Sequence, residues 1–352
     1  MVAAGIVLVA ILGVAACVAV LSSVLLLRRA RRRHSSRPDP QGVPPQDRRL
    51  PAVVINPSKF VQLGPIRAQI AGECAAMGWA APLWLETTVD DPGAGQARQA
   101  VEAGADVVLA CGGDGTVRQV AQSLAGTGVP IGLLPAGTSN LLARNLHMDL
   151  HDIPGATRIA LSGDDRAVDV GRVQLDDNGQ EQVFLMMAGM GFDAAIMAAA
   201  PEALKARVGP FAYFVAGLRS LSGHRTRIAL ETDGDPVRQL RVRTLVVGNC
   251  GRLLGGLVLM PDARIDDGVL DVVSIAPKGI VGWAAVTARV LTRRRKGHRR
   301  VEHWQARTIT VTADSELPAQ LDGDSVGDTH ALRIRVDPGA LVVRVPAVEQ
   351  GG

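Results

Sequence analysis

The sequence is poor in aromatic residues and in cysteine, and residues 1–27 contain no charged side chain. Aromatic residues make up 3% of the chain. They offer little surface on which bases could stack, which argues against a nucleic-acid partner. The four cysteines (Cys17, Cys74, Cys111 and Cys250) are widely scattered and show no metal-ligand spacing. They fit a protein of a reducing compartment.

The uncharged run of residues 1–27 predicts a transmembrane helix. As a helix it would reach roughly 40 Å, more than the roughly 30 Å of a bilayer core. Arginines follow it at residues 28–33 and none precede it, which is the reverse of a cleaved signal peptide. We therefore expect a single-pass anchor in the cell membrane, with the C-terminal bulk of the chain in the cytoplasm.

Residues 28–49 read as a basic, proline-rich linker. Eight arginines and two aspartates give this segment a net charge of +6, whereas the whole chain carries +4. The remainder is therefore slightly acidic. The basic character suits an anionic membrane surface better than nucleic acid.

Residues 50–165 alternate between short apolar runs and segments of helical period, which predicts an α/β domain with a parallel sheet. The expected strands are 52–55, 83–87, 105–110 and 129–134. The loops that follow them begin at Asn56, Thr87, Gly112 and near Gly137. In a parallel sheet these loops open on one edge, so we expect a nucleotide site there.

The loop Gly112-Gly113-Asp114-Gly115-Thr116 lies between a predicted strand and a predicted helix. Glycines allow a sharp turn and a close approach of the backbone, and the helix N-terminus attracts anions. A lone turn of this composition is most often a turn without a ligand. Asp114 and the second glycine loop near Gly137 favour phosphate binding here.

Residues 166–330 carry short strands, which predict an antiparallel β-sandwich domain. The stretch 260–271 places four carboxylates in ten residues, as in a solvated loop or a site for a hard divalent cation. The last residues, 331–347, predict a hairpin whose turn is Asp337-Pro338-Gly339.

Five motifs together carry a resemblance to a known family. They are residues 112–116, 134–144, 189–194, 261–271 and Asp322-Gly323-Asp324. The first is also found in NAD kinases and phosphofructokinases, but all five in this order are highly specific. From about Val53 to Val345 the chain resembles the diacylglycerol kinase catalytic family, and specifically the bacterial soluble-type lipid kinases related to sphingosine and ceramide kinases.

The resemblance implies an α/β nucleotide-binding domain, a β-sandwich lipid-binding domain, and terminal strands that return to the first domain. Asp324 stands at the position of the general base, and Asp114 resembles the acidic residue that acts beside the phosphates through Mg²⁺. Asp267 resembles a structural magnesium ligand, helped by main-chain groups near Arg264 and Val269. The implied ATP contacts are Asn56, Pro57, Ser58, Thr87 or Thr88, Gly112, Gly113, Asp114, Gly115, Thr116 and Thr138.

These expectations describe an ATP-dependent lipid kinase with Mg²⁺ that phosphorylates a membrane lipid hydroxyl, first of all converting diacylglycerol to phosphatidic acid. Two departures stand out: no glycine follows Asn56-Pro57 closely, and the base is Asp where Glu is common. The alternatives are an NAD kinase-like enzyme and a catalytically idle regulator that binds lipid or nucleotide. A homodimer stays open, because a two-fold interface leaves no motif.

Overall fold

The computed structural model describes residues 48–177, 179–191, 225–251, 259–276 and 301–347. Residues from Arg49 onward form one compact unit. The helices are η2 (Pro57–Lys59, a 3-10 turn), α2 (Leu63–Ala76), α3 (Ala94–Glu102), α4 (Asp114–Leu124), α5 (Leu141–Asn145) and α6 (Ile153–Ser162). The first strands are β1 (Pro51–Ile55), β2 (Leu83–Glu86), β3 (Val107–Gly112), β4 (Ile131–Pro135), β5 (Asp164–Leu175), β6 (Gln182–Phe184) and β7 (Met187–Met190). The later strands are β8 (Thr226–Thr232), β9 (Arg238–Val242), β10 (Thr244–Gly248), β11 (Leu270–Ile275), β12 (Val301–Ala306), β13 (Thr308–Leu321) and β14 (Asp324–Val345).

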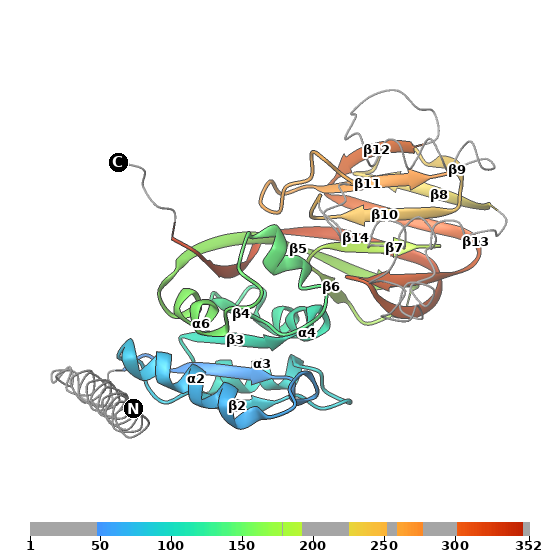
Figure 1. The fold of residues 1–352 in the computed structure, drawn as a ribbon. Helices are drawn as coiled ribbons and strands as arrows, with labels where there is room; N and C mark the ends of the chain where they lie inside the picture. Colours follow the sequence, from blue (N-terminus) through green and yellow to red (C-terminus); the bar gives the residue numbers. More distant parts are fainter. Residues whose placement is uncertain (1–47, 178, 192–224, 252–258, 277–300, 348–352) are drawn as a thin grey trace, which may run out of the picture. The chain divides into compact units, whose positions relative to one another are not determined.

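The N-terminal part is a parallel sheet with the strand order β2-β1-β3-β4 (Figure 1). Its central strands are buried on both faces, which explains why they read as continuous apolar runs. In β1, Ala52 and Val54 belong to one hydrophobic cluster and Val53 and Ile55 to another. The alternation assigns the clusters to opposite faces of the sheet.

Helices cover both faces of this sheet. Ala97 of α3 and Val120 of α4 join the cluster of Ala52 and Val54, whereas Ile70 of α2 and Ala160 of α6 join the other cluster. Gly132 of β4 is packed so closely under α6 that an added Cβ would lie 2.3 Å from the Cβ of Ala160. The predicted α/β arrangement is present.

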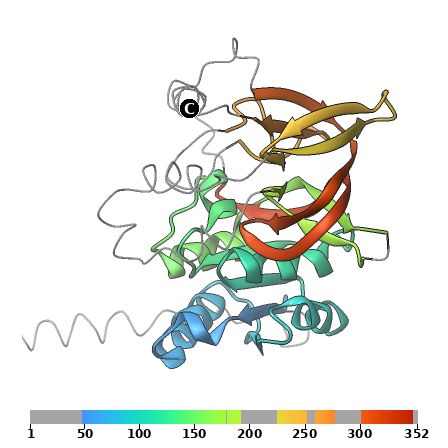
Figure 2. The same cartoon turned by 90° about the vertical axis from the view of Figure 1, so that its right-hand side faces the viewer.

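The C-terminal part consists of antiparallel strands that enclose their own core (Figures 1 and 2). Leu245 and Val247 of β10 face this core, and Val246 between them joins a separate small cluster. The long strand β13 pairs with β8 through Ile309–Ala313 and with β7 through Ala319–Leu321. A register shift between Thr312 and Leu317 separates the two pairings, as a β-bulge does when it bends a strand.

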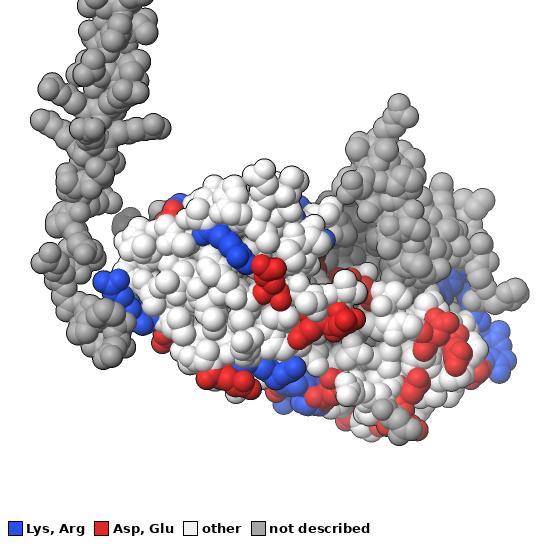
Figure 3. Space-filling view, turned by 90° about the horizontal axis from the view of Figure 1, so that it is seen from below, with Lys and Arg blue, Asp and Glu red and all other residues white. Residues whose placement is uncertain are grey.

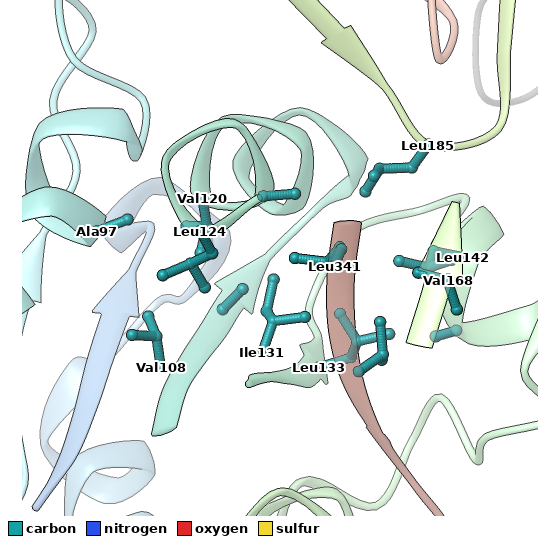
Figure 4. Close-up of a cluster of buried hydrophobic side chains, with 14 of the residues drawn as sticks. Ala97, Val108, Val120, Leu124, Ile131, Leu133, Leu142, Val168, Leu185 and Leu341 are labelled. Atoms are coloured by element: carbon teal, nitrogen blue, oxygen red, sulfur yellow. The ribbon is translucent and has the colours of Figure 1, made fainter. Parts of the chain in front are cut away.

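Strand β14 joins the two parts. It pairs with β13 and β5 in the sandwich and then runs parallel to β4, with Val343 opposite Ile131. Figure 4 shows Leu341 of β14 among Ile131 and Leu133 of β4 and Val168 of β5. The core of the α/β part is therefore completed by the last strand of the chain.

The predicted terminal hairpin is wrong. Asp337-Pro338-Gly339 does not reverse the chain but forms a bulge in the single strand β14, between Asp337 opposite Val170 and Leu341 opposite Val168. The carboxylate of Asp169 accepts the N–H of Gly339 at 2.8 Å and so holds the bulge. Proline, which has no N–H, is tolerated at such a bulge.

The predicted transmembrane helix is corrected as well. Residues 1–27 lie outside the described residues, and among those described no helix is long and apolar enough to cross a membrane. The longest of them, α2, has 14 residues, which reach roughly 21 Å against roughly 30 Å of hydrocarbon. The fold class is corrected to an α/β domain and a β-sandwich, with no spanning helix among the residues that the structure describes. The expected single-pass location in the cell membrane, which depended on that helix, is withdrawn.

Acidic and basic side chains lie interspersed on the face shown in Figure 3. Exposed ion pairs join neighbouring elements, for example Arg158 Nη1 with Glu73 Oε1 at 2.8 Å, and Arg67 with Glu86. Such pairs contribute at most about 1 kcal/mol each. The buried apolar clusters are therefore the main source of stability.

Candidate active site

Two glycine loops meet at the edge of the parallel sheet. β3 ends at Gly112 and α4 begins at Asp114, while the second loop lies between β4 and α5. A Cβ on Gly137 would lie 2.5 Å from the Cα of Gly113, so the loops touch backbone to backbone and only glycine fits. The first N–H groups of a helix have no partner within it. The junction is therefore suited to an anion such as a phosphate.

The neighbouring strand β1 contributes Asn56 to the same edge. Its side-chain N–H donates to Thr116 Oγ1 at 3.4 Å, and its Oδ1 accepts from the backbone N–H (3.0 Å) and the hydroxyl (2.7 Å) of Ser58. Thr116 in turn lies so close to Gly112 that an added Cβ there would be 2.6 Å from Thr116 Oγ1. Thr87, at the end of β2, is buried and donates its N–H to Ile55 O at 2.9 Å. The predicted nucleotide residues thus gather where β1 and β3 end side by side.

Asp114 connects the two loops. Its Oδ1 accepts the N–H of Leu141, the first residue of α5, at 2.6 Å. Burial raises the pKa of Asp114 to about 6; the Leu141 N–H opposes the rise, and Asp322 and Asp324 add to it. Carboxylates from distant parts of the sequence therefore lie near one another here.

Asp322 and Asp324 come from the tight turn between β13 and β14, in which Leu321 pairs with Asp324. Asp322 takes the left-handed conformation at φ +51° and Gly323 follows at φ +94°, as two-residue hairpin turns require. Asp322 is 6% exposed and accepts the backbone N–H groups of Leu185, Met186 and Met187 at 2.8–2.9 Å. Burial raises the pKa of Asp322, and these three N–H groups oppose the rise.

Asp324 lies over the first turn of α4. A Cβ on Gly115 would be 3.0 Å from Asp324 Oδ2, so the missing side chain leaves room for the carboxylate. The Nη2 of Arg118 lies 3.2 Å from the same oxygen, across 206 residues of sequence. The predicted base thus stands beside the predicted phosphate loop.

Three residues of this site were not assigned from the sequence: Arg118, Asp322 and Lys59. Arg118 is 6% exposed. In the sequence, Arg118 lies three residues before Ala121, so the two residues share one face of the predicted helix. A charged residue on that apolar face is the signal that could have revealed it. Lys59 reaches the glycine loop, since its Cε is 3.9 Å from a Cβ built on Gly113. Its signal was its place in the predicted loop after Asn56, which was expected on the same edge of the sheet as the Gly112 loop.

The remaining predicted ATP contacts lie in the loops that follow β1 and β4. Pro57 and Ser58 form the 3-10 turn after Asn56, with Ser58 exposed. Thr138 is exposed in the second glycine loop. Their assignment as nucleotide contacts stays a prediction.

The predicted magnesium residues line a pocket or lie beside one that is separate from the glycine loops. Asp267 Oδ1 accepts the N–H of Val269 at 3.2 Å, and the Arg264 side chain lies 3.6 Å from Asp266. Burial raises the pKa of Asp267, as do Asp271 and Asp169. The pocket around Asp267 contains, within the described part of the chain, no residue of either glycine loop; it is lined by Ala167, Asp169, Asp266, Asp267, Gly268, Arg307, Thr308, Arg335, Val336, Pro338 and Gly339.

Comparison with known proteins decides the family. Residues 80–173 match the model of the diacylglycerol kinase catalytic domain, and residues 186–345 match the YegS C-terminal NAD kinase beta sandwich-like domain. A protein of Pseudomonas aeruginosa named "Probable lipid kinase YegS-like" is 34% identical over 293 residues, covering 80% of this chain and 90% of that protein. The chain belongs to the diacylglycerol kinase family of lipid kinases.

Other members of this lipid kinase family agree with the assignment. A diacylglycerol kinase of Mycobacterium tuberculosis is 36% identical over 176 residues, covering 49% of this chain and 56% of that protein. A crystal structure of a diacylglycerol kinase from Bacillus anthracis has the same fold, with a TM-score of 0.65 and 22% identity over 84% of this chain and 96% of that one. The expected family and the kinase class are thereby confirmed.

The raised pKa of Asp114 gives a testable effect on stability. Because the folded state holds this proton more tightly than an aspartate with the ordinary pKa of 3.8 does, folding is favoured below about pH 4 and this contribution is lost as the pH rises through about 6. Asp114→Asn, whose amide oxygen still accepts the Leu141 N–H, should therefore unfold at higher denaturant concentration than wild type. We expect a gain of about 1–3 kcal/mol at pH 8 that shrinks at pH 5.

The matched control is Asp152→Asn. Asp152 is exposed at the N-terminus of α6 and accepts the Gly155 N–H at 2.8 Å, so it shares the helix-end geometry without the burial. It should show no such gain. A loss of stability in Asp114→Asn at pH 8, or a gain independent of pH, would contradict the account.

Proposed function

We propose that the chain is an ATP-dependent kinase that transfers the γ-phosphate to the hydroxyl of a membrane lipid, with diacylglycerol as the first acceptor to test. The observation that supports this most directly is the position of Asp324. Its carboxylate stands over the first turn of α4, beside two glycine loops in backbone contact. A proton acceptor next to a phosphate loop suits phosphoryl transfer to an alcohol.

In this proposal, groups of the chain itself bind the phosphates and accept the proton. The N–H groups at the start of α4 and of the glycine loops hold phosphate oxygens, and Lys59 adds a positive charge at the same place. Asp324 accepts the proton of the acceptor hydroxyl while that oxygen attacks the γ-phosphorus and the bond to ADP breaks. Asp114 stays next to the phosphates, fixed by the Leu141 N–H.

Magnesium fits this site only together with the nucleotide. Within the described residues, no three His, Cys, Asp or Glu side chains are close enough to hold a metal ion. Mg²⁺ commonly takes one or two carboxylates and completes its shell with substrate phosphates and water. Asp114 suits that role because the neighbouring carboxylates of Asp322 and Asp324 add negative charge that attracts a cation. A bound Mg²⁺ would stabilise the charge that develops on the transferred group. The donors near Asp267 do not make a complete set by themselves, so a structural ion there stays a prediction.

The acceptor class is proposed from the family and from the names of the relatives. Diacylglycerol, monoacylglycerol, a sphingoid base, ceramide and a polyprenol all offer a hydroxyl beside an apolar chain. Contact with an anionic membrane surface, where such a lipid resides, belongs to the same proposal.

The test is transfer of labelled γ-phosphate from Mg·ATP to these five alcohols in mixed micelles, with NAD included as an acceptor. We expect one labelled lipid that disappears with Asp324→Asn. Label on NAD would replace the proposal by an NAD kinase. ATP binding without transfer to any acceptor would replace it by a regulator.

A further inference from the structure

Arg118 is an unusual residue to find in the first turns of α4. It is 6% exposed, and its Nε and Nη1 are buried with no hydrogen-bond partner among the described residues. Only Nη2 has one, Asp324 Oδ2 at 3.2 Å. A buried cation that leaves donors unpaired is costly, because each lost partner carries a desolvation penalty.

The ion pair does not compensate that cost. The Asp324 side chain is 53% exposed, and pairs with such exposure contribute at most about 1 kcal/mol. An apolar side chain of similar length would stabilise the packing of α4 more, because replacing buried ionic groups by apolar ones is often neutral or stabilising. The residue is therefore better explained by what it does to its neighbours than by stability.

Its neighbours are carboxylates. Asp322 lies close enough for the guanidinium to oppose the burial-induced rise of its pKa, and Asp114 lies near both Asp322 and Asp324. Without a positive charge among them, Asp324 would be repelled from the glycine loop toward solvent. Arginine also has a planar, pre-organised fork that orients a carboxylate better than a lysine ammonium does.

We propose that Arg118 is a positioning residue for phosphoryl transfer, which holds the Asp324 carboxylate over Gly115 in the orientation that accepts the acceptor's proton. The inference rests on the proposed function. In the step it serves, the acceptor O–H bond breaks and its proton goes to Asp324. The oxygen bonds to the γ-phosphorus, and the bond from that phosphorus to the bridging oxygen breaks to release ADP.

The experiment is a double-mutant cycle on the full chain with Arg118→Met, Asp324→Asn and the double variant, measured with the best acceptor found. Arg118→Met should lower kcat by about 10–100-fold, because small misplacement of a reacting group has effects of that size. KM for ATP should stay within about twofold and the melting temperature should not fall. Arg118→Lys should recover part of the loss in kcat.

The double variant tests whether Arg118 acts through Asp324 or independently of it. In the Asp324→Asn background, Arg118→Met should cost nothing further, since it acts through that carboxylate. Arg158→Met, which removes an exposed arginine paired with Glu73 on α2, is the matched control and should leave kcat unchanged.

Several results would overturn the proposal. They are an unchanged kcat in Arg118→Met, losses that add in the double variant, a rise in KM for ATP alone, and loss of folding in both Arg118 variants. Full activity of Asp324→Asn is a different result. It would remove the base from the proposed function, whatever Arg118 does.

Discussion

Asp324→Asn is expected to lower kcat by about 10²–10⁴-fold, the range for removal of a general base. Asparagine has the size of aspartate and its amide oxygen can still face Arg118, but it cannot take a proton at neutral pH. KM for ATP should change little, because the glycine loops and the start of α4 are untouched. Steady-state kinetics with the acceptor identified by phosphate transfer would measure both constants.

The control for this variant is Asp328→Asn. Asp328 is an exposed aspartate four residues further along β14, so the substitution makes the same charge change on the same strand. Its kcat should equal that of wild type. If Asp324→Asn stayed within about threefold of wild type, a base at this position would be excluded, since removal of a general base costs far more.

The use of aspartate in place of the more common glutamate has a structural counterpart. An aspartate carboxylate extends less far from the backbone, so its strand has to approach the phosphate loop more closely. Here the two-residue turn brings Asp324 to the first turn of α4, and Gly115 leaves the space in which Oδ2 lies. The aspartate oxygen thereby lies 3.0 Å from a Cβ built on Gly115.

Asp322→Ala is expected to destabilise the fold by about 3–9 kcal/mol, because it leaves three buried or partly buried N–H groups without an acceptor at about 1–3 kcal/mol each. Those groups belong to Leu185, Met186 and Met187, which lead into β7. Alanine also tolerates the φ of +51° poorly, at roughly 1 kcal/mol. A loss of this size is a large part of a domain's stability. Urea unfolding followed by circular dichroism would measure it.

Asp233→Ala is a close control for the effect of burial. Asp233 also has φ +51° and also precedes a glycine, and it accepts the N–H groups of Arg307 and Thr308 at 2.7–2.8 Å. It is exposed, however, so water can replace it, and we expect a loss of about 1–2 kcal/mol. Equal losses in the two variants would show that backbone strain, and not the buried N–H groups, explains the effect of Asp322→Ala.

Local sequence signals predicted the α/β part well, because its strands and loops can each be recognised from residues that are neighbours in the chain. Strands such as β1 and β3 are buried on both faces and therefore read as apolar runs, and each ends in a polar or glycine loop. The same kind of signal failed at Asp337-Pro338-Gly339. Its composition indicates a turn, but Asp169 of β5 accepts the Gly339 N–H and keeps the strand continuous. The apolar run at residues 1–27 predicted a spanning helix, and no such helix is found in the described part of the chain.

Residues that are neighbours in the chain were enough to predict the parallel sheet, the two glycine loops and the family. The packing of distant segments, in contrast, places Asp324 over α4, pairs Arg118 with it and brings Lys59 to Gly113. Arg118 and Asp324 are 206 residues apart. Their meeting depends on β14, which pairs with β13 at one end and with β4 at the other. No local pattern encodes that distance, because it follows from the packing of the whole chain.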